Sequence, residues 1–210
     1  IEVTAANLAP EAPLNLTARS NGDEVTLSWI APPDPGDDLA GYDLERDGVV
    51  ITTELIPSDT LIYLDTGLPD GLHVYRVIAV DQSDQRTPSD SVAAPIHTPF
   101  WRPAGPVTPE TGIDLSGEGA HPHGTVELQV FSPGEGAAIA AVIEADQDGV
   151  FDAEDIALRP GSNSFTAWST DGDGNTSRLS RPRVVVSDKP PHRVENLWAE
   201  ASGSDITLGW

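Results

Sequence analysis

The chain has 210 residues, 38% of them hydrophobic, and 34 acidic against 11 basic side chains give it a net charge of −23. A field of this sign repels nucleic acids and anionic lipids, so neither is an expected partner. No cysteine is present, which excludes disulfides and thiolate metal sites and leaves the hydrophobic core to stabilise each domain.

Short runs in which apolar and polar residues alternate occur along the whole chain, and no long run shows helical spacing. Glycine and proline number 19 each, as expected for many turns. These features predict an all-β fold of tandem β-sandwiches. No stretch approaches the roughly 20 apolar residues of a membrane span. Ile1 opens on a strand-like IEVT without a signal sequence, so we expect the gene to begin upstream.

Residues 10–98 contain seven candidate strands separated by turn clusters such as NGD and PPDPGDD. That density of strands is typical of a β-sandwich. The runs are LNLTA, EVTLSWI, GYDLERDG, VVITT, TLIYLD, LHVYRVIAV and SVAAPI.

The order of these runs resembles a fibronectin type III module, with Trp29 in its strand B, Tyr42 in strand C and DTGLPDGLHVYRVIAVD leading into strand F. His73 stands where this family usually carries a tyrosine, and we expect it to donate a hydrogen bond there. The expected core includes Trp29, Tyr42, Leu68, Tyr75 and Val77.

Residues 99–104 are predicted to be a proline-stiffened linker, and residues 105–188 a second set of strands with a period of two. The stretch EADQDGVFDAEDIALRPGSNSFTAWSTDGDGNTSRLS resembles the bacterial immunoglobulin-like (Big-type) family in its acidic DG turn, its GxN motif and its DxxGNxS turn. The resemblance implies an immunoglobulin-like sandwich.

An internal repeat is the most informative feature, because residues 13–29 align without gaps with residues 194–210. Residues 189–210 are therefore predicted to be the first two strands of a second, incomplete fibronectin type III-like domain. The same offset places IEVTA opposite PRVVV, within the PRVVVS stretch, so residues 1–9 are predicted to be the last strand of a preceding immunoglobulin-like module plus a linker. The parent protein would alternate the two modules.

Two strands cannot cover their apolar face alone, so the incomplete module needs an explanation. The favoured one is that the chain is a fragment of a longer protein. The alternative is strand exchange at the chain ends with neighbouring modules or identical subunits, which would build a filament.

Two acidic turns provide candidate calcium ligands, although neither has the glycine and glutamate positions of an EF-hand loop. We favour the interpretation that these side chains accept backbone hydrogen bonds in tight turns. His121 and His123 in AHPHG have the spacing of metal ligands but no third partner, so a solvent-exposed turn is expected. The calcium candidates are Asp146, Asp148, Asp171 and Asp173.

Trp101, Trp168 and Trp198 are expected at the surface because of their positions in the linker or out of phase with core residues. In a chain of modules they would cover the joints between domains. Alternatively, they would stack on the sugar rings of a surface glycan.

None of the patterns GxSxG, HExxH or GxxxxGK[ST] occurs, so enzymatic activity and a resident cofactor are not expected. An array of rigid modules usually provides length, spacing or display. The predicted function is an extracellular structural or adhesive repeat module, acting as a spacer, cell-surface or filament-forming component. The alternative is an accessory region, spacer or carbohydrate-binding, of a secreted polysaccharide-degrading enzyme.

Overall fold

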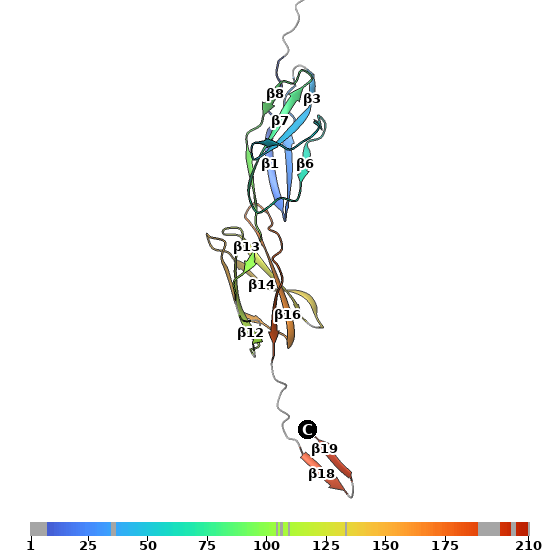
Figure 1. Ribbon diagram of the computed structural model, residues 1–210, viewed down its shortest axis with the longest axis vertical. Coiled ribbons are helices and arrows are strands. Elements are labelled where there is room, and N and C mark those ends of the chain that lie inside the picture. The colour runs from blue at the N-terminus through green and yellow to red at the C-terminus, as the bar shows by residue number, and fades with distance from the viewer. Residues whose placement is uncertain are drawn as a thin grey trace, which may run out of the picture.

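The computed structural model contains two β-sandwiches placed end to end, followed by a separate hairpin (Figure 1). It describes residues 8–34, 37–103, 105, 107–108, 110–132, 134–188, 198–202 and 205–209. All secondary-structure elements within these ranges are strands, which confirms the prediction of tandem all-β sandwiches. Nowhere in these ranges is there a helix long and apolar enough to cross a membrane.

The first sandwich has the strand order of a fibronectin type III-like fold. One sheet has the order β1-β2-β6, and the other has the order β4-β3-β7-β8, with β5 beside β3 and β9 beside β7. The strands are β1 (Leu14–Asn21), β2 (Glu24–Ile30), β3 (Leu39–Arg46), β4 (Val49–Val50), β5 (Ile56–Pro57), β6 (Ile62–Asp65), β7 (Gly71–Asp81), β8 (Arg86–Pro88) and β9 (Val92–Ile96).

The core of the first sandwich follows from the alternation of residues along these strands. Val25, Leu27 and Trp29 point inward from β2, and the Trp29 ring meets Tyr42 of β3 edge-on, with the ring centres 5.4 Å apart. All five predicted core residues are at most 4% exposed. The predicted core of this sandwich is thus confirmed.

His73 of β7 forms the corner contact expected of it. Its Nε2 lies 3.0 Å from the Pro69 carbonyl oxygen, and its Nδ1 lies 2.9 Å from Oδ2 of Asp47. Both ring nitrogens therefore face acceptors, which favours the doubly protonated imidazolium. Burial opposes that charge, but the bonds to Asp47 and Pro69 outweigh it and raise the pKa of His73 above its ordinary 6.5.

We expect the first sandwich to lose stability as the pH rises. A raised folded-state pKa gives stabilisation that is complete below the ordinary value and is lost as the pH passes through the folded value. The free energy of unfolding should therefore fall as the pH rises above about 6.5, the ordinary pKa of histidine. Chemical denaturation at several pH values measures this, and His73→Gln should flatten the dependence. An equally steep dependence in His73→Gln would assign it to other groups.

The second sandwich is immunoglobulin-like, with sheets of order β10-β12-β15 and β11-β17-β16-β13-β14. Its strands pair antiparallel except β11, which runs parallel to β17. They are β10 (Phe100–Trp101), β11 (Val107–Thr108), β12 (Gly112–Glu118), β13 (Thr125–Ser132), β14 (Gly136–Glu144), β15 (Phe151–Ala157), β16 (Gly161–Thr170) and β17 (Arg183–Ser187).

The predicted linker 99–104 needs a correction, because β10 lies within it and pairs with β12. The second sandwich therefore begins at Phe100, and the link between the two domains is only a few residues long. Gly117 makes this packing possible, since a Cβ there would overlap Cζ of Phe151 and lie 2.7 Å from the Phe100 carbonyl oxygen.

Asn163 gives the GxN motif a physical role. Its side chain is fully buried at the start of β16 and makes four hydrogen bonds. Its Oδ1 accepts from Ser132 Oγ at 2.8 Å and from the Arg159 amide at 3.0 Å. Its Nδ2 donates to the carbonyl oxygens of Arg159 at 2.7 Å and Gly161 at 3.1 Å. The amide thus ties the segment before β16 to the end of β13.

The terminal hairpin, β18 (Trp198–Ser202) and β19 (Asp205–Gly209), supports the internal repeat. Trp198 pairs with Gly209 as Thr17 pairs with Ser28, and each later pair keeps the same offset. The structure therefore repeats the register of β1 and β2 in β18 and β19. The strand predicted within residues 1–9 falls mainly on residues 1–7, outside the described ranges.

Candidate functional site

The contacts between the two sandwiches form an extended polar site, called here the interdomain joint. It comprises the β1–β2 turn, the turn before β7, residues 97–99, the loop before β13 and the loop after β16. The Gly22 amide donates to the Thr176 carbonyl at 3.0 Å, and the Thr176 amide donates to the Ser20 carbonyl at 3.0 Å. The two domains thus share a short stretch of strand-like pairing between Asn21 and Thr176.

The DGDGN turn fixes the side chain of Asn175, which contacts the first sandwich across the joint. Oδ1 of Asp171 accepts from the amides of Asp173 at 2.9 Å and Asn175 at 2.8 Å, while its Oδ2 accepts from Nδ2 of Asn175 at 2.7 Å. Held in this way, Oδ1 of Asn175 accepts from the Ser20 amide at 2.8 Å in a buried position. Burial opposes ionisation of Asp171, but hydrogen bonds from Asn175 and Asp173 lower its pKa.

Arg178 bridges the two domains with its side chain and its backbone. Its amide donates to the His97 carbonyl at 2.8 Å, and its guanidinium donates to the Leu68 carbonyl. The guanidinium also lies 3.6 Å from Asp23 and 3.8 Å from Asp70, both of the first sandwich. A planar fork of donors suits such divergent acceptors better than a single ammonium would.

Two imidazoles meet at the joint, His97 from the link and His121 from the loop before β13. Their ring centres are 4.5 Å apart with an edge-to-face geometry. His121 is 2% exposed, and its Nε2 has no hydrogen-bond partner. Burial lowers the pKa of both side chains, and the proximity of His97 adds to the effect on His121.

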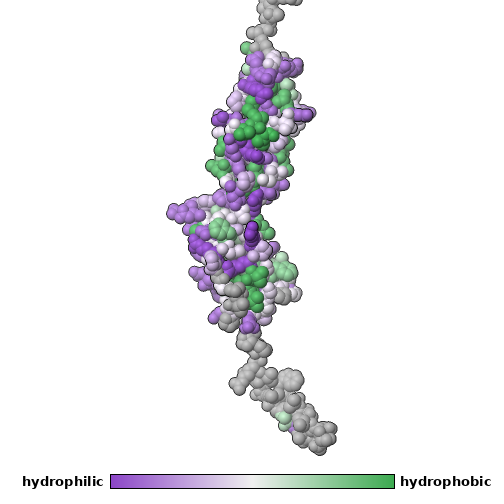
Figure 2. All heavy atoms as spheres, in the orientation of Figure 1, coloured by the Kyte–Doolittle hydropathy of each residue, from purple (hydrophilic) through white to green (hydrophobic). Residues whose placement is uncertain are grey.

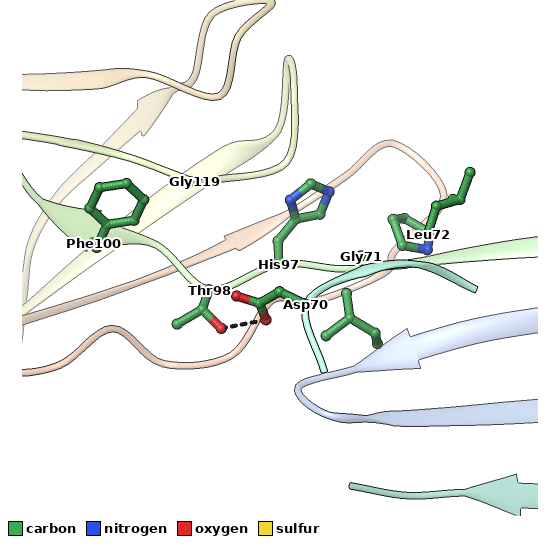
Figure 3. Close-up of a pocket in the computed structure, with 9 residues that line it drawn as sticks. Asp70, Gly71, Leu72, His97, Thr98, Phe100 and Gly119 are labelled. Carbon is green, nitrogen blue, oxygen red and sulfur yellow. Dashed lines mark hydrogen bonds between the residues drawn. The ribbon is translucent and has the colours of Figure 1, made fainter. Parts of the chain in front are cut away.

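A pocket of about 460 Å³ opens beside His97. Asp70 and Leu72 line it from the first sandwich, and Phe100 and Gly119 line it from the second, with His97 between them (Figure 3). Oγ1 of Thr98 donates to Oδ1 of Asp70 at 2.8 Å, which ties the link to the turn before β7. The surface around the junction is largely hydrophilic in the view of Figure 2. The contacts described above that cross the joint are hydrogen bonds, ion pairs and the His97–His121 ring contact.

The acidic turns adopt the favoured arrangement, in which side chains accept backbone hydrogen bonds. Oδ1 of Asp146 accepts from the amides of Asp148 at 2.8 Å and Val150 at 2.9 Å, as Asp171 does in its own turn. Within the described ranges, no three His, Asp or Glu side chains are grouped to hold a metal ion. Calcium binding by the four aspartates stays an untested prediction.

The prediction of a solvent-exposed turn is wrong for His121. The AHPHG segment does turn, with His123 exposed at a positive φ of 54°, but His97 and Ser169 enclose the His121 ring. Sequence periodicity missed this because His97, a residue of the link between the domains, provides part of the cover.

The three predicted surface tryptophans have different environments. Trp101 is half-buried, donates from Nε1 to the Arg181 carbonyl at 2.9 Å and packs edge-on against Phe151 at 5.8 Å. It thus anchors the link to the second sandwich. Trp168 lies half-buried on the outer face of β16, opposite Glu127 of β13. The side chain of Trp198 lies outside what the structure describes.

No protein-family model matches the chain. An alignment 120 positions long, which covers 51% of the chain, is 30% identical to an amylopullulanase of Thermoanaerobacter thermohydrosulfuricus and spans 8% of that protein. Solved structures with some similarity include the fibronectin(III)-like modules of Clostridium thermocellum CbhA, with 11% identity, TM-score 0.34, and 87% and 98% of the two chains covered. Another is a tetra-tandem repeat of a large adhesion protein, with 18% identity, TM-score 0.36, and 78% and 45% covered.

Proposed function

We propose that the chain is a rigid extracellular spacer, whose two sandwiches hold neighbouring parts of a longer protein at a fixed distance and orientation. The observation that carries this proposal is the interdomain joint. Two modules connected only by a flexible linker would need no buried amide such as Asn175 between them, nor a guanidinium shared among Leu68, Asp23 and Asp70. Neighbouring modules of the same kind are the proposed partners.

The short link supports this role. Ile96 ends β9 and Phe100 begins β10, so the residues between them cannot act as a long tether. Thr98 and His97 are further fixed by Asp70 and by the Arg178 amide. The relative orientation of the two domains is thereby constrained on several sides of the link.

Backbone ¹⁵N relaxation of the intact chain at neutral pH tests the proposal. A rigid spacer predicts that residues of both sandwiches report one anisotropic rotational diffusion tensor. Separate correlation times for the two domains would show a flexible linker and would overturn the spacer role.

A second candidate is a spacer or carbohydrate-binding region within a secreted polysaccharide-degrading enzyme. The match of about half of this chain to an amylopullulanase favours it. Both candidates require the same rigid spacer. They differ in whether the spacer is connected to other structural modules or to a catalytic domain. A catalytic domain in the same gene would select the enzyme context.

If the second sandwich binds glycans through Trp168, soluble oligosaccharides should quench tryptophan fluorescence, because sugar rings stack on exposed aromatic faces. Trp168→Ala should abolish the quenching. Trp101→Phe is the matched control, since it retains the aromatic contact with Phe151 and should keep the quenching. Fluorescence that is unchanged across a broad oligosaccharide panel would remove the glycan-binding role and leave the spacer role.

A further inference from the structure

His121 is held by one polar contact and otherwise enclosed. Its Nδ1 lies 2.9 Å from Oγ of Ser169, and the same Oγ accepts from the His121 amide at 3.0 Å. The opposite nitrogen, Nε2, is buried without a partner. In this environment a neutral imidazole lacks one hydrogen bond, the one at Nε2.

Protonation makes the environment of His121 less favourable whichever nitrogen carries the first proton. If Nδ1 accepts from the Ser169 hydroxyl, the first proton is already on Nε2, and the added proton goes to Nδ1, where the hydroxyl must turn so that its Oγ accepts; Nε2–H still has no acceptor. If Nδ1 already donates, the added proton goes to Nε2, where there is no acceptor. In both cases a buried cation is left with an unsatisfied donor, which costs more than the loss of a neutral hydrogen bond.

His97 increases this cost because its ring contacts His121 from the other side of the joint. Two imidazolium ions at this distance repel each other. The charged groups around the pair are Asp70, from the turn before β7, Asp171, from the turn after β16, and the Arg178 guanidinium. The carboxylates favour protonation, yet burial prevails and the pKa of both histidines is lowered from 6.5.

We propose that the His97–His121 contact makes the interdomain joint acid-sensitive, so that the rigid spacer becomes a hinged one in mildly acidic solution. This regulation rests on the spacer function proposed above. When the joint opens, both imidazole rings are exposed to water, and water solvates the imidazolium ions that form on protonation. A group with a lowered closed-state pKa stabilises the closed state above its ordinary pKa, and this stabilisation is lost as the pH falls below that value.

The size of the effect follows from linkage. A histidine pKa lowered by one unit on closing corresponds to about a tenfold lower ratio of closed to open joints at a pH below both values. Two coupled histidines would act together on the same equilibrium, which makes the transition steeper than for one group.

Spin-label distances in the full chain test the inference, because a chain without cysteine accepts two labels cleanly. Exposed Ser58 and Ser162, one in each sandwich, are changed to cysteine. We expect one narrow distance distribution at about pH 8 and a broad one at about pH 5, with the change beginning below about pH 6.5. His97→Phe and His121→Phe, singly or together, retain an aromatic contact. Each should move the broadening of the distance distribution to a lower pH. His123→Gln, an exposed control in the same loop, should not.

The outcomes separate this inference from the proposal beneath it. A distribution that is broad at every pH overturns the spacer function itself. One that stays narrow down to about pH 5 overturns the acid-sensitive joint and leaves the spacer in place. Broadening with the same midpoint in His97→Phe and His121→Phe as in the unmodified chain overturns the assignment to these histidines. Circular dichroism of each variant confirms that both sandwiches remain folded.

Discussion

Replacing Arg178 with alanine is expected to uncouple the two sandwiches while leaving each one folded. The substitution removes the hydrogen bond to the Leu68 carbonyl and the ion pairs with Asp23 and Asp70. A hydrogen bond from a charged donor contributes about 1.5–3 kcal/mol. The two longer ion pairs are partly exposed and add little. The single rotational diffusion tensor in ¹⁵N relaxation should therefore separate into two.

Two controls define the role of the Arg178 guanidinium. Arg178→Lys retains the positive charge but cannot serve divergent acceptors, so it should give an intermediate loss of coupling. Arg159→Ala removes an exposed arginine that pairs with Glu135 at 2.8 Å within the second sandwich, and it should leave the coupling unchanged. Equal loss of coupling in Arg178→Ala and Arg159→Ala would mean that net charge, and not this bridge, sets the orientation of the domains.

Asn163→Ala should be among the most destabilising single substitutions in the second sandwich. It leaves Ser132 Oγ, the Arg159 amide and the carbonyl oxygens of Arg159 and Gly161 without their partner at a fully buried position. Ser132 Oγ is buried and the other three groups are part-buried, so water replaces some of the lost bonds. With about 1–3 kcal/mol for each group that stays unsatisfied, a total loss of about 3–5 kcal/mol is expected. Hydrogen exchange of the β16 amides measures the stability of this domain directly.

Ser162→Ala is the matched control, because Ser162 is the exposed neighbour of Asn163 on the same strand. Its effect should lie within about 0.5 kcal/mol. A loss below about 1 kcal/mol for Asn163→Ala would show that water replaces the amide, and the GxN motif would then have no structural role at this position.

The sequence predicted well those features that depend on local alternation. The period of two placed Trp29, Tyr42 and Tyr75 in the first core because inward and outward residues alternate along a strand. The gapless repeat correctly anticipated that the second hairpin would keep the register of the first, from Trp198 with Gly209 to Ser202 with Asp205. The acidic turns followed from the ability of aspartate to accept backbone hydrogen bonds.

The interdomain joint could not be predicted because its contacts join residues far apart in sequence. Arg178 and Leu68 are separated by 110 positions, and the acceptor is a backbone carbonyl that every residue carries. The sequence places Asn175 in a turn, but its contact with Ser20 depends on the placement of a second domain. The sequence does not predict the short strand β10, because two residues cannot display a period.

Residual dipolar couplings of the intact chain at neutral pH test the central claim most directly, since they report the orientation of each sandwich within a common frame. The rigid-spacer account predicts that couplings from both sandwiches fit a single alignment tensor when the domain orientation shown in Figure 1 is used. Two tensors of different magnitude would mean that the domains move independently in solution, and this result would contradict the account.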